Sequence, residues 1–204
     1  MSWHPASKNI GALYERHAAA FDGDRGKRLV ERAWMERFRA AMPQNAAVLD
    51  LGCGSGEPVA RFLIEAGHRV TGVDSSPSLI DLCRSRFPAQ DWIVADMRDL
   101  RLDRRFGGII AWNSSFHLTP DDQRAMWDVF RAHAEPGAAL MFTSGPASGE
   151  AIGEYQGEAL YHASLDPADY EELAAEHGFD VVSYVPEDRD CGGLTVWLMQ
   201  KRFG

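Results

Sequence analysis

Three glycines on alternate positions are the residues of this chain best suited to hold a ligand: Gly52, Gly54 and Gly56. They follow an apolar run over residues 48–51 that carries one acid, Asp50. Such a run before glycine is typical of a buried strand, and the amphipathic spacing after the loop is typical of a helix. Because glycine has no Cβ, a ligand can lie directly against the backbone at the strand end. We therefore expect a strand, a ligand-binding loop and a helix.

The loop lacks the patterns that bind dinucleotides and phosphates. In the dinucleotide form G-x-G-x-x-G the third glycine would stand at position 57, where this chain has Glu57. No Gly-Lys-Ser/Thr sequence follows the loop. An acid at a helix start suits the helix dipole but opposes a bound diphosphate. The loop thus favours a ligand without phosphates over NAD or ATP.

Two later predicted strands also end in acids. Residues 69–74 end in Asp74, 18 residues after Gly56, where a carboxylate can accept hydrogen bonds from both hydroxyls of a ribose. Residues 92–97 bring Asp96 to the end of a third strand, where it can accept a hydrogen bond from an exocyclic amine. This second acid would suit adenine.

In order and spacing these motifs resemble those of class I S-adenosylmethionine-dependent methyltransferases. The resemblance rests on residues 50–56 (DLGCGSG), 72–76 (GVDSS), 95–97 (ADM) and 135–138 (EPGA) and covers nearly the whole chain. It implies S-adenosylmethionine as the cofactor, with the loop glycines under the methionine part and Asp50 orienting its amino group. It also implies Asp74 and Ser75 at the ribose, Asp96 at the adenine amine and Met97 against the adenine ring.

The expected fold is α/β, a three-layer Rossmann-like arrangement around a mixed sheet of seven strands. The resemblance implies that the last strand is antiparallel to the others. Two additional amphipathic helices are expected before the glycine loop, over residues 10–21 and 28–42. We expect one domain, with N-terminal capping helices, a cofactor-binding core, an acceptor-site cover and the rest of the sheet over residues 1–44, 45–144, 145–166 and 167–204.

Composition limits the partners of the protein. With 30 acidic and 21 basic side chains the net charge is −9, and nucleic-acid binding relies on Lys and Arg, so we expect a small-molecule acceptor and no nucleic acid. No run approaches the roughly 18 apolar residues of a membrane span, and the N-terminus lacks a signal-peptide core, which favours a cytoplasmic protein. The three cysteines show no paired metal spacing, so no metal is expected. The oligomeric state is not indicated.

The fourth predicted strand ends at Trp112 and Asn113. By their position these residues should border the cofactor sulfonium, where an aromatic face favours a cation. The alternative for Trp112 is a core position, and His117 is expected to pack beside the cofactor. The stretch lacks the Asn/Asp-Pro-Pro-aromatic sequence of enzymes that methylate amino groups of nucleic acids, which also argues against a nucleic-acid substrate.

Acceptor recognition is expected between residues 145 and 166, where glycine recurs every four residues: Gly145, Gly149, Gly153 and Gly157. Each interior glycine costs a helix about 0.5 to 1 kcal/mol, so a mobile cover is the better interpretation. In the strand-like run that follows, His162 is the candidate general base and Tyr161 could orient the acceptor. The alternative for His162 is a structural, hydrogen-bonded role. Tyr14 and His17 are candidates for closing over the cofactor.

Two other classes of function remain open. A nicotinamide-dependent oxidoreductase would share the fold, although Glu57 and Asp96 argue against it. A catalytically silent cofactor-binding module is harder to exclude, because every strong motif concerns the cofactor and none the acceptor. The motifs identify neither the acceptor nor the atom that would be methylated.

Overall fold

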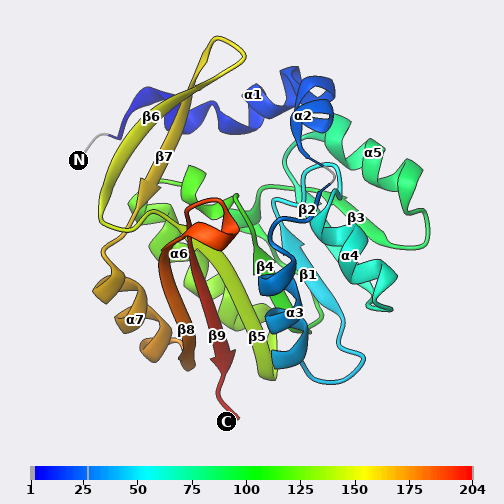
Figure 1. Cartoon of the computed structure of the whole chain (residues 1–204), viewed down its shortest axis with the longest axis vertical. Coiled ribbons are helices and arrows are strands. Elements are labelled where there is room, and N and C mark those ends of the chain that lie inside the picture. Colours follow the sequence, from blue (N-terminus) through cyan, green and yellow to red (C-terminus); the bar gives the residue numbers. More distant parts are fainter. Residues whose placement is uncertain (1–2, 27, 204) are drawn as a thin grey trace.

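A mixed sheet forms the centre of the computed structural model, which describes residues 3–26 and 28–203 (Figure 1). Across the sheet its seven strands are β3 (Asp91–Val94), β2 (Val70–Asp74), β1 (Val48–Leu51), β4 (Phe106–Ala111), β5 (Ala134–Ser144), β9 (Leu194–Lys201) and β8 (Phe179–Asp188). Strands β1 to β5 are parallel, and β9 is antiparallel to both its neighbours. The expected sheet with an antiparallel last strand is confirmed, and that strand lies inside the sheet.

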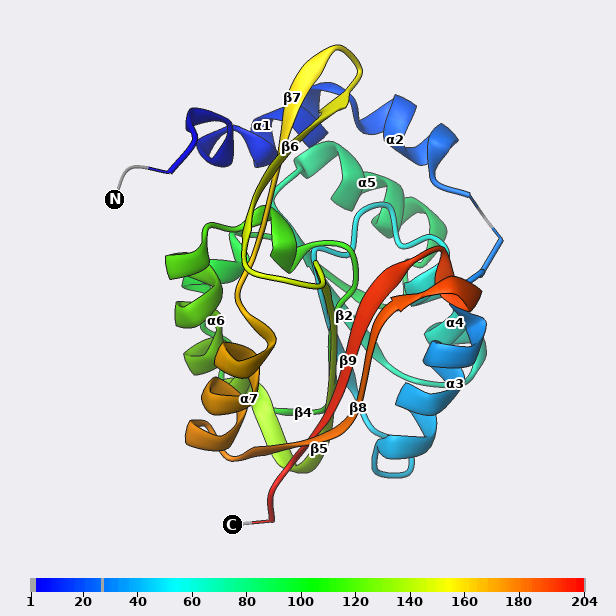
Figure 2. The ribbon, with the colours of Figure 1, turned by 60° about the vertical axis from the view of Figure 1, so that its left-hand side comes forward.

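Helices cover both faces of the sheet (Figure 2). One face carries α3 (Arg32–Ala41), α4 (Val59–Glu65) and α5 (Pro77–Arg86), and the other carries α6 (Pro120–His133) and α7 (Pro167–Glu176). Every residue of β1 and of β4 is buried, as expected for parallel strands covered on both faces. Trp34 and Phe38 anchor one apolar cluster, and Trp127 and Phe130 anchor the other.

Three of these helices begin with the same N-terminal capping arrangement. In α5, α6 and α7 a proline occupies the first turn, and the preceding side chain caps the helix by accepting a backbone N–H bond. At α5, Ser76 Oγ accepts from Leu79 N at 3.2 Å. Because Ser76 comes two residues after Asp74, this cap also fixes the chain where β2 ends.

The N-terminal segment differs from the expected pair of helices. The first is interrupted at His17 and forms α1 (Ile10–Arg16) and α2 (Ala18–Asp24). The second begins only at Arg32. Both differences coincide with tertiary contacts, since His17 reaches Glu158 and the buried Glu31 pairs with Arg25. Four short 3-10 turns complete the helices: η1 (Pro5–Lys8), η2 (Met97–Asp99), η3 (Ser115–His117) and η4 (Arg189–Cys191).

The segment expected to be a cover is a β-hairpin. Strands β6 (Gly149–Tyr155) and β7 (Glu158–Ser164) pair antiparallel, and Gln156 and Gly157 form the two-residue turn, both with positive φ. The hairpin lies with α1 above the carboxyl ends of the sheet strands (Figures 1 and 2). No helix among the described residues is long and apolar enough to cross a membrane.

Candidate functional site

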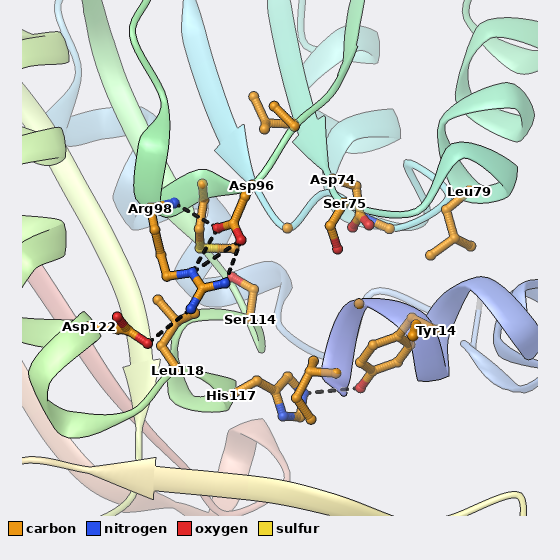
Figure 3. Close-up of a pocket in the computed structure, with 18 of the residues that line it drawn as sticks. Tyr14, Asp74, Ser75, Leu79, Asp96, Arg98, Ser114, His117, Leu118 and Asp122 are labelled. Atoms are coloured by element: carbon orange, nitrogen blue, oxygen red, sulfur yellow. Dashed lines mark hydrogen bonds and ion pairs between the residues drawn. The ribbon is translucent and has the colours of Figure 1, made fainter. Parts of the chain in front are cut away.

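Two adjoining cavities lie between the carboxyl ends of β1, β2 and β4 and the overlying α1–α2 segment. We name the first the Asp74 cavity (Figure 3) and the second the Asp50 cavity, after the acids that line them. Both are lined by Tyr14, Phe21, Gly52, Gly54, Asn113 and His117. One elongated ligand can therefore extend through both cavities past the glycine loop.

The glycine loop leaves no room for side chains toward these cavities. Gly52 has a φ of +73°, and a Cβ there would lie 2.3 Å from the Cβ of Ser114. Gly54 has a φ of +55°, and its Cβ would lie 3.0 Å from the Phe21 ring. Gly56 lines neither cavity and instead approaches Phe87, where a Cβ would lie 3.0 Å from the ring. The loop thus combines a ligand surface with one glycine required for packing.

Asp74 joins the end of β2 to the glycine loop. Its Oδ2 accepts from Gly54 N and its Oδ1 accepts from Ser76 N, each at 2.9 Å. Burial raises the pKa of Asp74, and these backbone bonds oppose that shift. Each carboxylate oxygen has a further lone pair, and Asp74 lines its cavity beside Ser75 (Figure 3).

Asp96 also lines the Asp74 cavity, together with Met97, but it is held by a cation. Arg98 donates from Nε to Asp96 Oδ1 at 3.0 Å and from Nη2 to Oδ2 at 2.6 Å. The Arg98 guanidinium also contacts Asp122 Oδ2 at 3.1 Å (Figure 3). The hydrogen bonds from Arg98 lower the pKa of Asp96, so this carboxylate stays ionised. No motif in the sequence indicated this ion pair.

Asp50 is the most deeply buried acid that lines either cavity, with 3% of its surface exposed. Burial first, and then the charge of Asp74, raise the pKa of Asp50 to about 7, while Arg25 opposes the shift. Arg25 is the one Lys or Arg among the described residues that line this cavity. Its Nη2 donates to Glu31 Oε1 at 2.7 Å, and Glu31 is 1% exposed. No motif in the sequence pointed to Arg25 or Glu31.

Tyr14 and His117 form a hydrogen-bonded pair where the two cavities meet (Figure 3). His117 Nδ1 lies 2.7 Å from the carbonyl oxygen of Tyr161, which can only accept, so Nδ1 carries the proton. His117 Nε2 therefore accepts from the Tyr14 hydroxyl, at 3.0 Å. Burial lowers the pKa of His117 to about 4 and raises that of Tyr14 to about 12, so both groups are neutral. His117 lines both cavities.

The two candidate catalytic residues on β7 point to different places, because neighbouring strand residues face opposite sides. His162 lines the Asp50 cavity, with its ring centroid 4.8 Å from that of His117 and 5.3 Å from that of Phe116. Tyr161 is fully buried against Ala6 in a separate small cluster. The structure therefore does not bring Tyr161 to either cavity. Burial lowers the pKa of His162.

Trp112 and Asn113 both lie at the site. Trp112 lines the Asp50 cavity, and its indole Nε1 is buried without a hydrogen-bond partner among the described residues. Asn113 lines both cavities with a φ of +51°. Its backbone N–H donates to Thr143 Oγ1 at 2.9 Å. Within residues 3–26 and 28–203, no group of three His, Cys, Asp or Glu side chains could hold a metal ion.

Comparison with known proteins identifies proteins that are similar to this chain. Residues 48–137 match the family model of a methyltransferase domain. A dTDP-3-amino-3,4,6-trideoxy-alpha-D-glucopyranose N,N-dimethyltransferase of Streptomyces venezuelae is 30% identical over 105 residues, 50% of this chain and 44% of that protein. A malonyl-(acyl-carrier protein) O-methyltransferase of Pseudescherichia vulneris is 36% identical over 101 residues, 48% of this chain and 39% of that protein.

A solved structure has the same fold over nearly the full length. It is a Burkholderia thailandensis 1,6-didemethyltoxoflavin-N1-methyltransferase with bound 1,6-didemethyltoxoflavin and S-adenosylhomocysteine, with a TM-score of 0.72, 20% identity and coverage of 99% of this chain and 93% of that one. The chain spans less than half the length of the two curated relatives. The matched residues 48–137 hold the glycine loop, the cavity-lining acids Asp74 and Asp96, and Trp112. These comparisons, with the family match over residues 48–137, support a class I S-adenosylmethionine-dependent methyltransferase.

Proposed function

We propose that this protein transfers the methyl group of S-adenosylmethionine to a small-molecule acceptor and releases S-adenosylhomocysteine. The observation that carries the proposal is the division of charged groups between the two adjoining cavities: Asp74 and Asp96 line one, and Asp50 and Arg25 line the other. S-adenosylmethionine carries an adenine amine and two ribose hydroxyls on one side of its sulfonium and an ammonium with a carboxylate on the other. Gly52 and Gly54 line both cavities, so backbone without a Cβ is available to the middle of such a molecule.

Each group of the site has a distinct part in this proposal. Asp96 and Asp74 accept hydrogen bonds from the adenine amine and the ribose, and Met97 packs on the ring. Asp50 pairs with the ammonium, and Arg25, held by buried Glu31, pairs with the carboxylate. These assignments leave Gly52, Gly54, Asn113, Tyr14 and His117 at the centre of the bound molecule, because they line both cavities.

Methyl transfer requires the protein mainly to align the two reactants and to exclude water. When bound, the cofactor supplies a methyl group already activated by a sulfonium centre. Alignment of an acceptor in line with the carbon–sulfur bond then accounts for most of the rate. The α1 helix covers the site with Tyr14, and the β6–β7 hairpin adds His162 to its wall. An ion pair of Arg16 with Glu158 and a hydrogen bond between His17 and Glu158 hold the hairpin against α1.

The relatives support a small acceptor. By name, the Streptomyces venezuelae protein acts on a dTDP-amino sugar, and the Burkholderia thailandensis protein acts on a toxoflavin precursor. The net charge of −9 agrees with a substrate other than nucleic acid. We extend a small-molecule acceptor to this chain on that basis.

Ligand-induced stabilisation tests the proposal. S-adenosylhomocysteine should raise the free energy of unfolding by about 2.7 kcal/mol at a hundredfold excess over its dissociation constant, because it binds the folded state alone. NAD should have no effect, since Glu57 occupies the third glycine position of a dinucleotide loop. Thermal unfolding with each ligand measures this difference. Stabilisation by NAD together with inert S-adenosylhomocysteine would refute the proposal. Binding of S-adenosylhomocysteine with no methyl transfer to any acceptor would identify a silent module.

A substitution at Asp74 tests the position of the ribose. Asp74→Ala should weaken S-adenosylhomocysteine binding by about 1.5 to 3 kcal/mol, roughly ten- to a hundredfold, because two hydrogen bonds to a charged group are lost. Asp81→Ala on the exposed side of α5 is the matched control and should bind normally. Titration calorimetry measures both variants. Equal affinities would show that Asp74 does not hold the ribose.

A further inference from the structure

Arg98 contacts the carboxylate of Asp96 through both its backbone and its side chain (Figure 3). Asp96 Oδ1 accepts from Arg98 N at 2.9 Å and from Arg98 Nε at 3.0 Å. The same Nε lies 3.1 Å from Oδ2, which also accepts from Nη2 at 2.6 Å. The guanidinium thus meets the carboxylate as a planar fork, and such a fork fixes the orientation of a carboxylate as well as pairing with its charge.

These contacts leave Asp96 little capacity to accept further hydrogen bonds. An ionised carboxylate offers about four acceptor sites. The backbone N–H of Arg98, its shared Nε–H and one Nη2–H fill most of them. The same hydrogen bonds lower the pKa of Asp96, so at neutral pH this group accepts and does not donate. Asp96 is left with room for about one more donor in the cavity that it lines.

The guanidinium of Arg98 is held from a second side by Asp122. Its Nη1 donates to Asp122 Oδ2 at 3.1 Å, and Asp122 lies in the first turn of α6 and lines the same cavity (Figure 3). The side chains of Arg98 and Asp96 are 44% and 37% exposed, and ion pairs this exposed contribute little to folding stability. These contacts instead give the acceptor oxygens of Asp96 a defined direction.

We propose that Arg98 is a positioning residue for recognition of the cofactor base: it holds Asp96 so that the carboxylate accepts one donor, the exocyclic amine of adenine. This inference rests on the proposed function, which places adenine beside Asp96. The amine takes the remaining acceptor site, and Asp122 keeps the guanidinium in place. A purine without this amine gains nothing from the arrangement. Arg98 therefore determines how strongly the site distinguishes adenine from other purines.

Two nucleosides that differ only in the amine test the inference: adenosine and purine riboside, which has hydrogen in place of the amino group. Their binding to the whole protein is measured by ligand-observed NMR. The ratio of the two dissociation constants reports the amine alone, because ribose and ring are the same in both. The native protein should bind adenosine at least tenfold more tightly, the effect of a hydrogen bond to a charged group.

Substitution of Arg98 should change this ratio and not the fold. In Arg98→Met the preference should fall to threefold or less, because adenosine binds more weakly while purine riboside binds within twofold of its native affinity. Arg98→Lys keeps the charge without the fork and should resemble Arg98→Met. Asp122→Asn should give an intermediate ratio. Arg202→Met is the matched control, because Arg202 also pairs with an acid, Asp180, but lines neither cavity.

The outcomes separate this inference from the proposed function. If neither S-adenosylhomocysteine nor adenosine binds, the proposed function fails and the inference fails with it. If S-adenosylhomocysteine binds, a native ratio near one shows that Asp96 does not accept the amine and overturns the inference alone. A merely structural role of Arg98 would weaken both nucleosides equally and leave the ratio unchanged. A larger ratio in Arg98→Met would show that Arg98 competes with the amine for Asp96, and a native ratio in Arg98→Lys would show that charge suffices without the fork; each result overturns the positioning role.

Discussion

Asp50 shows how its surroundings set the charge of a single residue. It lies in a cavity with one guanidinium, Arg25, and faces the carboxylate of Asp74, and burial raises its pKa to about 7. Near neutral pH this acid is therefore half protonated before any ligand binds. A ligand with an ammonium group selects the ionised form. In the proposed function, cofactor binding is thus coupled to loss of a proton at Asp50.

This coupling predicts a pH-dependent affinity. With a pKa of about 7, Asp50 is about one-tenth ionised at pH 6 and about three-quarters ionised at pH 7.5. Affinity for S-adenosylhomocysteine should rise roughly five- to tenfold over this range in calorimetric titrations. Asp50→Asn should bind more weakly and lose most of that rise. Asp74, whose pKa is also raised, remains in both proteins, so the difference isolates Asp50. A variant with the same pH dependence as the native protein would contradict the coupling.

His162 gives a second prediction at this scale. His162→Gln should leave S-adenosylmethionine affinity within about twofold, because no motif residue that holds the cofactor is changed, and turnover should fall. General acid or base catalysis contributes about 10² to 10⁴ in rate, and a positioning hydrogen bond about tenfold or less. Steady-state kinetics with an acceptor that the protein methylates measures the loss. His177→Gln, on the α7 side of the protein, is the control. Unchanged turnover would show that His162 lines the cavity without taking part in the reaction.

Single residues also show which parts of the site a sequence can predict. Asp50, Asp74 and Asp96 could be predicted because they stand at strand ends, and parallel strands bring their ends to one edge of the sheet. Arg25, Glu31 and the Tyr14–His117 pair could not. Their partners are 6 and 103 residues away and meet only through tertiary packing. The adjacent candidates Tyr161 and His162 could not both face one cavity, because strand residues alternate.

Among the elements, the glycine loop offers a prediction with a built-in control. Gly52→Ala places a Cβ 2.3 Å from Ser114 at a φ of +73°, so it should destabilise the fold by about 1 kcal/mol or more and greatly weaken S-adenosylhomocysteine binding. Gly23 lies in α2 with no atom near its would-be Cβ. Gly23→Ala should raise stability by up to about 1 kcal/mol and leave binding unchanged. Normal binding by Gly52→Ala would show that the ligand does not lie against the loop.

The hairpin shows where the period of a pattern is ambiguous. Glycine at every fourth residue fits one face of a helix, and the cost of interior glycines favours a mobile cover instead. Four is also a multiple of the two-residue strand period, so Gly149 and Gly153 share one face of β6. The Gln156–Gly157 turn, with both φ values positive, fixes the pairing of β6 with β7. A turn pair between two short strands was the local signal that indicated a hairpin here.

For the molecule as a whole, two buried groups of the site change stability with pH in opposite directions. Between pH 4 and 6.5 the unfolded chain protonates His117 while the folded protein, with a pKa of about 4, does not. Stability from His117 therefore rises with pH, by about 1.4 kcal/mol per unit. For Asp50 the folded protein keeps a proton up to about pH 7 that the unfolded chain loses above 3.8. Stability from Asp50 falls with pH at a similar slope.

These opposite slopes predict that removing the Asp50 carboxylate reveals the pH dependence that His117 gives to the free energy of unfolding. In the native protein the two contributions nearly cancel between pH 4.5 and 6. In Asp50→Asn the His117 contribution is no longer offset, so the free energy of unfolding should rise over this interval by about 2 kcal/mol more than in the native protein. Denaturant unfolding at several pH values measures the slope, which does not depend on any constant cost of the amide. Asp81→Asn, an exposed acid of α5, is the control and should keep the native slope. If Asp50→Asn also keeps the native slope, Asp50 ionises in the folded protein as it does in the unfolded chain, and the proton-coupled binding of the cofactor falls with it.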